Sequence, residues 1–231
     1  MLDSCEEDII NTWLKNAKPW IKAVRYNEIE SRVLITNKSI QECILKESPD
    51  HVLDVGCGEG WLVRELSSQG INSVGIDIVP ELITAALDKN MGDYRVLSYK
   101  DISKGKIKEI FDVIVCNFSL LGDESVSELF KQIPFMLNNT GCLIVQTIHP
   151  LSSCDIDTYE DGWRKGSWHG FSHQFTDPAP WYFRTLESWK NLFNIHQFKI
   201  TEILEPINPK TGEPASIIFI CNATHVLLHN S

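Results

Sequence analysis

Along residues 50–148, short continuous apolar runs alternate with stretches in which the apolar residues have helical spacing. Five short apolar runs have the length and composition of buried strands. They cover residues 52–55, 73–77, 94–99, 111–117 and 141–148. Three stretches between them place apolar side chains at helical spacing. They cover residues 61–68, 80–89 and 124–137. This alternation predicts right-handed crossovers and an open parallel sheet with helices on both faces.

The last part of the chain departs from this alternation. Residues 187–194 have helical spacing, but the apolar runs at 199–204 and 216–221 are separated only by a turn at Thr211 and Gly212. Two strands joined without a helix pair as antiparallel neighbours. We therefore predict an α/β fold whose seven-stranded mixed sheet is parallel except for one antiparallel C-terminal strand.

The first 48 residues are predicted to be helical. Apolar positions follow helical spacing from Ile9 to Ala17, Pro19 is expected to interrupt them, and a second helix is expected over residues 37–46. This segment either packs on the sheet or forms an N-terminal helical lid over residues 1–48. As a lid, it would bring Arg32 or Tyr26 to a ligand.

Residues 150–185 form an insertion after the fifth strand. Eight of the 27 positions from 163 to 189 are aromatic, which is too apolar for a linker. The segment leaves the sheet at the carboxyl ends of the strands, where α/β sheets bind ligands. It forms either a satellite hydrophobic core or a cap over a substrate. As a cap, it would offer four aromatic side chains to the substrate: Trp168, Phe171, Trp181 and Tyr182.

Composition and charge narrow the choice of partners. The chain has 231 residues, 43% hydrophobic and 23% charged, as expected of one globular domain over residues 1–231. The formal net charge of −10 disfavours nucleic acid or an anionic membrane surface as partner. The lysines between 100 and 108 are interpreted as a solvated loop. No apolar run approaches the roughly 20 residues of a membrane span.

Cysteine usage and the first residues bear on the compartment. Seven cysteines are scattered without a C-x-x-C pair, and most lie in apolar runs. The first residues are acidic and lack the basic and apolar layout of a signal peptide. We therefore expect free thiols in a reducing cytoplasm, and no zinc site.

The strongest chemical signal follows the first predicted strand. Residues 52–60 read V-L-D-V-G-C-G-E-G, an apolar run with Asp54 ahead of three alternate glycines. Glycine is needed where a turn requires positive φ, or where a ligand must approach the backbone without a Cβ in the way. The helix that follows adds free N–H groups. The segment predicts a cradle for a small ligand at the carboxyl end of the first strand.

The spacing of glycines and acids narrows the ligand. A nicotinamide dinucleotide site reads G-x-G-x-x-G, but Trp61 stands at the third glycine of that pattern. A bulky side chain there obstructs the close packing that a pyrophosphate site needs. Asp77 closes the second strand, 23 residues after Asp54. That spacing suits a carboxylate that accepts both hydroxyls of a ribose.

With these motifs, residues 50–150 resemble the class I S-adenosylmethionine-dependent methyltransferases, and in style their small-molecule branch, which includes quinone-biosynthesis enzymes. Residues 54–60, Asp77 and residues 111–117 carry the resemblance, and the terminal pair of strands fits the same fold. The resemblance implies a Rossmann-like sheet and S-adenosylmethionine as cofactor, with S-adenosylhomocysteine as product. It also implies methyl transfer by in-line displacement to a small-molecule acceptor, with no nucleic-acid or membrane partner.

The resemblance further implies cofactor contacts. Gly56 and Gly58 would let the backbone approach the methionine part, Asp54 would orient the loop and the amino group, and Asp77 would hold the ribose. The other expected contacts are Arg32 from the lid, Cys57 and Gly60 in the loop, Ile78 on the adenine face, Asp101 and Ile102 at the adenine edge, and Asn117 and Phe118 at the methionine end. An Asp101 that caps a helix in solvent is the structural alternative.

One histidine is a candidate general base, and two others are candidate metal ligands. His149 lies just past the fifth strand, so we expect it to act as general base in the same crevice. A structural histidine at the turn beside Pro150 is the alternative. His169 and His173 have the spacing of metal ligands on a helix, but Gly170 favours a loop and no metal is expected.

Two other functions stay open at this point. A protein or RNA methyltransferase would need a basic groove or a peptide channel. A protein that binds S-adenosylmethionine without transferring its methyl group would need only the cradle.

Overall fold

A seven-stranded sheet forms the centre of the computed structural model, which describes residues 2–152 and 158–224. The strand order is β3-β2-β1-β4-β5-β9-β8. The strands are β1 (His51–Val55), β2 (Asn72–Asp77), β3 (Asp93–Val96), β4 (Phe111–Asn117), β5 (Leu137–Thr147), β8 (Phe198–Leu204) and β9 (Ile217–Ala223). β9 lies between β5 and β8 and runs antiparallel to both, whereas the other six strands share one direction. The predicted fold class is confirmed.

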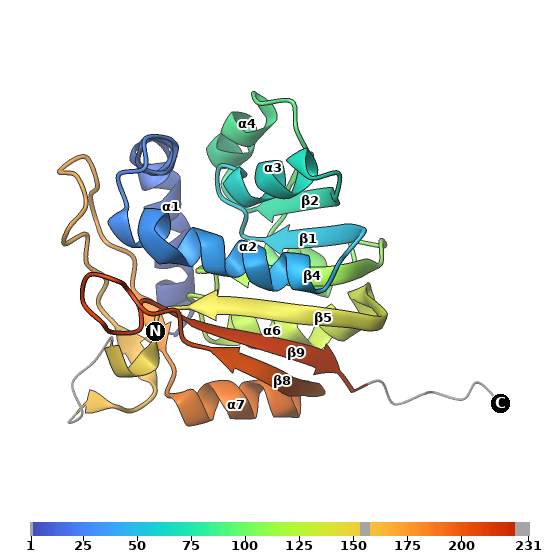
Figure 1. Ribbon diagram of the computed structural model, residues 1–231. Helices are drawn as coiled ribbons and strands as arrows, with labels where there is room; N and C mark the ends of the chain where they lie inside the picture. Colours follow the sequence, from blue (N-terminus) through green and yellow to red (C-terminus); the bar gives the residue numbers. More distant parts are fainter. Residues whose placement is uncertain (1, 153–157, 225–231) are drawn as a thin grey trace.

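Helices cover both faces of this sheet (Figure 1). One layer contains α2 (Asn37–Lys46), α3 (Trp61–Ser68) and α4 (Pro80–Leu87), and the other contains α5 (Tyr99–Ser103), α6 (Glu124–Gln132) and α7 (Leu186–Ile195). Side chains alternate along each strand. In β4, Val113 and Val115 therefore enter the first layer, whereas Ile114 and Cys116 enter the second.

The N-terminal helix α1 (Leu2–Arg25) lies across the carboxyl ends of the parallel strands, beside the insertion (Figure 1). Pro19 lies inside this helix, so the predicted interruption is wrong. Proline removes one helical hydrogen bond. Buried Ala17 and Ala23 on either side of it show that packing of both halves outweighs this loss. A π-helical turn, η1 (Arg32–Thr36), then leads into α2.

Among the elements after residue 50, three boundaries differ from the prediction by three or more residues. β3 ends at Val96, because Ser98 and Asp101 form a capping box that begins the short helix α5, which the apolar pattern did not reveal. α6 ends at Gln132, where the 3-10 turn η2 (Ile133–Met136) contains Pro134. This turn leads directly into β5, four residues earlier than the predicted start at 141.

The insertion contains a little regular structure. It begins with η3 (Pro150–Ser152), and β6 (Gly162–Arg164) pairs antiparallel with β7 (Trp181–Phe183). Strands of three residues are too short for a periodic pattern to reveal. Residues 153–157 of the expected cap, including Cys154, lie outside the described residues. None of the described helices has the length and apolar character needed to cross a bilayer.

Candidate active site

The glycine loop after β1 presents bare backbone beneath the lid helix. The N–H groups of Gly56 and Cys57 donate to the Ile76 carbonyl at 2.8 and 2.9 Å. Gly60 has a φ of 82°, and a Cβ there would lie 2.5 Å from the Tyr94 ring, so only glycine fits. A Cβ on Gly58 would lie 3.3 Å from Trp20 Nε1 of α1. Trp20 of α1 therefore lies next to the predicted cradle, and the lid over residues 1–48 stays a prediction.

Asp77 fixes the shape of this loop. Its Oδ2 accepts the Gly58 N–H at 2.9 Å, and its Oδ1 accepts the Val79 N–H at 2.9 Å. Burial raises the pKa of Asp77, while these backbone hydrogen bonds act in the opposite direction. Each carboxylate oxygen can accept a second hydrogen bond. Asp77 can therefore hold the loop and still receive hydroxyl groups of a ligand.

Asp54 is the second acid at the loop. It is only 2% exposed, and its Oδ1 has no hydrogen-bond partner among the described residues. Burial raises its pKa to about 7, with Asp77 adding to the shift and Arg32 opposing it. A buried carboxylate oxygen without a donor is costly unless a ligand supplies one.

Arg32 approaches the same place from the π-helical turn. Its guanidinium lies 5.6 Å from the Trp20 ring and 4.9 Å from the Trp61 ring. Nε donates to Asn37 Oδ1 at 3.1 Å, but Nη2 is buried without an acceptor in the described structure. Burial lowers the pKa of Arg32 to about 10, although Glu59 and Asp54 act against this. The π-helical turn thus presents a cationic side chain whose Nη2 has no hydrogen-bond acceptor in the described structure.

The end of β4 adds two residues to the candidate site. Asn117 Oδ1 is buried without a hydrogen-bond partner among the residues described. Phe118 has a φ of 54°, which is unusual for a bulky residue, and its N–H donates to the Gln146 carbonyl at 2.8 Å. Strained backbone of this kind occurs at functional sites. Phe118 also lines a cavity together with residues of the insertion.

Two residues expected at the adenine edge have other contacts. Asp101 Oδ2 accepts the Ser98 N–H at 3.0 Å, and its Oδ1 pairs with Lys106 at 2.6 Å. Lys106, helped by Ser98, holds the pKa of Asp101 well below its usual range. Ile102 is 1% exposed and belongs to the main core. These contacts match the helix-capping alternative. Ile78, expected on the adenine face, packs like Trp20 against the cluster of Ala17, Val79 and Leu82.

Glu59 is a site residue that the sequence analysis missed. Its side chain is completely buried inside the glycine loop, and it pairs with Arg25 of α1 and Arg64 of α3. It therefore links the lid to the cradle. An acid between two glycines was visible in the sequence, but nothing indicated that an arginine 34 residues earlier would reach it. Cys57 beside it is buried, and burial raises the pKa of its thiol well above the usual value.

The aromatic residues of the insertion separate into two groups. Trp168 and Phe171 pack against Trp13 and Trp20 of α1, above the glycine loop. Asn16 fastens this contact, because its amide donates to the Thr176 carbonyl at 2.8 Å and accepts the Thr176 N–H at 2.9 Å. These contacts hold α1 and this part of the insertion together.

The second aromatic group surrounds a cavity at the ends of β4 and β5. Trp181 and Tyr182 line it from the insertion, and Phe118 lines it directly after β4. The volume of this cavity is about 40 Å³. Of the four aromatic residues expected at a substrate, the structure places Trp181 and Tyr182 here, and Trp168 and Phe171 in the first group.

His149 does not line this cavity in the described structure, although Ile148 and Pro150 on either side of it do. It is 3% exposed, and its Nε2 lies 2.9 Å from Glu205 Oε1. Nδ1 is buried and has no partner among the described residues. The arrangement favours the structural alternative, with Glu205 rather than the backbone as partner.

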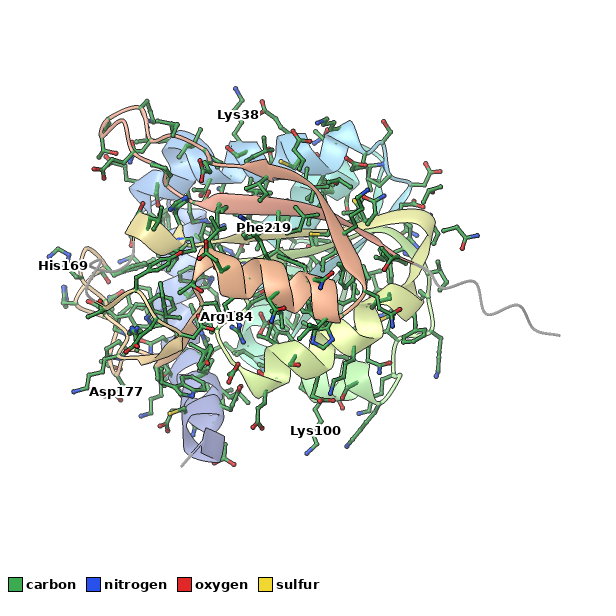
Figure 2. The ribbon with its side chains drawn as sticks, turned by 90° about the horizontal axis from the view of Figure 1, so that it is seen from below. Lys38, Lys100, His169, Asp177, Arg184 and Phe219 are labelled. Carbon is green, nitrogen blue, oxygen red and sulfur yellow. The ribbon has the colours of Figure 1, made fainter. Side chains whose placement is uncertain are left out.

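No cluster of three side chains from His, Cys, Asp or Glu that could hold a metal ion occurs in residues 2–152 and 158–224. His169 lies at the outer edge of the insertion (Figure 2). It lies in a turn, not in a helix, so its spacing to His173 does not align the two rings as a helix would.

The family of the chain follows from its sequence as a whole. The model of a methyltransferase domain family matches residues 26–203, well over half of the chain. The chain therefore belongs to this methyltransferase domain family. The resemblance described above is confirmed.

Individual relatives match part of the chain. An uncharacterized methyltransferase of Schizosaccharomyces pombe is 38% identical over 96 residues, which are 41% of this chain and 37% of the relative. A ubiquinone biosynthesis O-methyltransferase of Xylella fastidiosa is 35% identical over 103 residues, 42% of either chain. The mouse 18S rRNA (guanine-N(7))-methyltransferase is 32% identical over 75 residues, 32% of this chain and 26% of the relative. The chain spans less than half the length of these relatives.

Solved structures share the fold over nearly the whole chain. The 1,6-didemethyltoxoflavin-N1-methyltransferase of Burkholderia thailandensis has a TM-score of 0.69 at 16% identity, and the match covers 97% of this chain and 91% of that one. An S-adenosylmethionine-dependent methyltransferase of Clostridium acetobutylicum has a TM-score of 0.65 at 18% identity, and the match covers 88% and 98%. At such identities the likeness shows the fold.

Proposed function

We propose that this chain is an S-adenosylmethionine-dependent methyltransferase that acts on a small-molecule acceptor. One observation carries the proposal. Asp54 Oδ1, Asn117 Oδ1 and Arg32 Nη2 are three buried polar atoms beside the glycine loop without partners in the described structure. Two acceptors and a cationic donor are complementary to the ammonium and carboxylate groups at the amino-acid end of the cofactor. Membership of the methyltransferase family supports the same function.

The other cradle residues fit this cofactor. In the proposal, Asp77 accepts the ribose hydroxyls, and Gly56, Cys57, Gly58 and Gly60 provide backbone without obstructing side chains. Ile78 offers an apolar surface to the adenine ring. The cofactor supplies an already activated methyl group, so the protein mainly orients the reactants and excludes water.

The acceptor is proposed to bind at the cavity beside Phe118, with Trp181 and Tyr182 as its aromatic walls. Trp168 and Phe171 would act from the lid side and close the crevice. The relative named for ubiquinone biosynthesis supports a small-molecule acceptor. The reducing cytoplasm is part of the same proposal, supported by six described cysteines that are all free.

An RNA acceptor is the second candidate, because relatives named as 18S rRNA (guanine-N(7))-methyltransferases also match part of this chain. The net charge of −10 speaks against it, since a polyanion must be held by basic groups. A small molecule therefore fits the chain better.

Incubation with methyl-labelled cofactor and a size-fractionated cell extract tests this choice. We expect label in the small-molecule fraction. Label found only in RNA or protein would refute the proposed acceptor class. No transferred label, together with cofactor binding, would leave the chain as a binding protein.

A further inference from the structure

Arg184 directly follows β7 and is buried, with 4% of the residue exposed. Its guanidinium stacks 4.7 Å from the Tyr182 ring and 5.2 Å from the Trp189 ring. Figure 2 shows it where the insertion meets the main body of the molecule. A buried cation between aromatic rings, beside a ligand cavity, needs a function or a full set of partners.

The partners of Arg184 are incomplete. Nη1 donates to the Gly122 carbonyl at 2.9 Å, and Nη2 donates to the carbonyl and the Oδ1 of Asp123 at 3.2 and 3.0 Å. A guanidinium has five N–H groups. The Nε–H and one N–H of Nη1 therefore have no acceptor among the described residues.

The charge of Arg184 is also only partly compensated. Its ion-pair partner in the described structure is Asp123, whose side chain is 38% exposed and therefore solvated. Burial lowers the pKa of Arg184, whereas Asp123, Tyr182, Asp161 and Glu6 oppose this shift. Of the three carboxylates, Asp123 alone lies at ion-pair distance in the described structure, so the free N–H groups of Arg184 can still donate to a second anionic group.

The cavity has room for such a group. Arg184 is one of its lining residues, together with Phe118, Trp181 and Tyr182. The cavity volume of about 40 Å³ exceeds the roughly 10–15 Å³ needed by one water molecule, so a group as small as a carboxylate fits. A ring attached to that group would lie against the aromatic walls of the cavity.

We propose that Arg184 recognises an anionic group on the methyl acceptor, which makes the acceptor class flat, aromatic and negatively charged. The inference rests on the proposed function, because it places the acceptor at this cavity. Arg184 acts as a specificity-determining residue, and the aromatic walls hold the ring.

Three probes with one ring and three charges test the proposal. The full chain is saturated with S-adenosylhomocysteine and titrated with benzoate, benzamide or benzamidine. The tryptophan fluorescence, to which Trp181 and Trp189 at the cavity contribute, reports binding. We expect benzoate to bind at least about tenfold more tightly than the neutral or cationic probe, because a charge-assisted hydrogen bond is worth that factor or more. Arg184→Gln should remove the preference.

A matched control is Arg164→Gln. Arg164 also lies over an aromatic ring of the insertion, 5.2 Å from Phe183, but is not among the residues described as lining the cavity. This variant should keep the preference for benzoate. If Arg184→Gln fails to fold, Asp123→Asn gives the opposite test, because it removes the compensating carboxylate and should tighten benzoate binding.

Equal affinity for the three probes, or no binding of any of them, would overturn the inference. So would a preference for benzoate that survives in Arg184→Gln or is unchanged in Asp123→Asn. Failure of S-adenosylhomocysteine to bind would instead refute the proposed function, so the two failures are distinguishable.

Discussion

The buried carboxylate of Glu59 accepts the Arg25 Nε–H at 3.0 Å, which joins the last turn of α1 to the glycine loop. A side chain within the predicted cradle thus anchors the lid above it. Arg64 of α3 forms a second ion pair with Glu59, in which Arg64 Nη2 lies 2.6 Å from Glu59 Oε1. The position of the lid and the shape of the loop are therefore coupled.

Glu59→Gln should destabilise the protein. Removing one partner of a buried ion pair leaves the other charges uncompensated, at a cost of about 3 kcal/mol in the free energy of unfolding. Urea denaturation measures this. Glu42→Gln is the control, because its pair with Lys38 is exposed and should contribute less than about 0.5 kcal/mol. Similar small losses in both variants would contradict the coupling.

Asp54 should make cofactor binding dependent on pH. Its folded-state pKa of about 7 lies above the value of about 3.9 for an unfolded chain. Its contribution to the stability of the free protein is therefore fully present below about pH 4 and is lost as pH rises through 7. A ligand ammonium requires the ionised form, so affinity for S-adenosylhomocysteine should increase over the same rise.

Calorimetric titration between pH 5.5 and 8.5 measures this dependence. Asp54→Asn should bind more weakly and lose the increase in affinity. A wild-type affinity that does not change through pH 7 would show that Asp54 does not pair with the ammonium.

A comparison of Gly58→Ala with Gly170→Ala should separate the effect of backbone strain from that of a Cβ that obstructs the cradle. Gly58 and Gly170 both have positive φ, at 59° and 84°. Alanine should cost about 1 kcal/mol of stability at each position. Nothing lies within 4 Å of a Cβ at Gly170, whereas a Cβ at Gly58 meets Trp20. Only Gly58→Ala should therefore weaken binding of S-adenosylhomocysteine, and equal binding by the two variants would remove Gly58 from the site.

The hydrophobic pattern predicted most of this architecture. The runs in β1, β2 and β4 are buried on both faces, and the paired run before the C-terminus could only form antiparallel strands. Element ends were less predictable where a local contact decides them, as in the Ser98–Asp101 capping box. Pro19 was misleading because tertiary packing of α1 outweighs one lost hydrogen bond.

The candidate site was predictable where its residues are close in sequence. Residues 54–60 and Asp77 carry their own signal, because glycine at alternate positions has few structural uses. Arg25, Trp20 and Arg184 act through contacts with residues more than 30 positions away. No periodic pattern reports such contacts.

His149→Gln tests the role of this histidine. Because its ring pairs with Glu205 and does not line the cavity in the described structure, the variant should lower the melting temperature and change turnover by less than about threefold. Turnover is measured on the labelled acceptor fraction. A loss of about a hundredfold or more with unchanged cofactor binding would identify His149 as the general base.

Thermal unfolding with and without cofactor product tests the central claim most directly. S-adenosylhomocysteine at a hundred times its Kd should stabilise the protein by about 2.7 kcal/mol, which raises the melting temperature by roughly 5–10 °C. NADH should cause no shift, and Asp77→Ala should abolish the shift. Stabilisation by NADH, with none by S-adenosylhomocysteine, would contradict the assignment of the cradle.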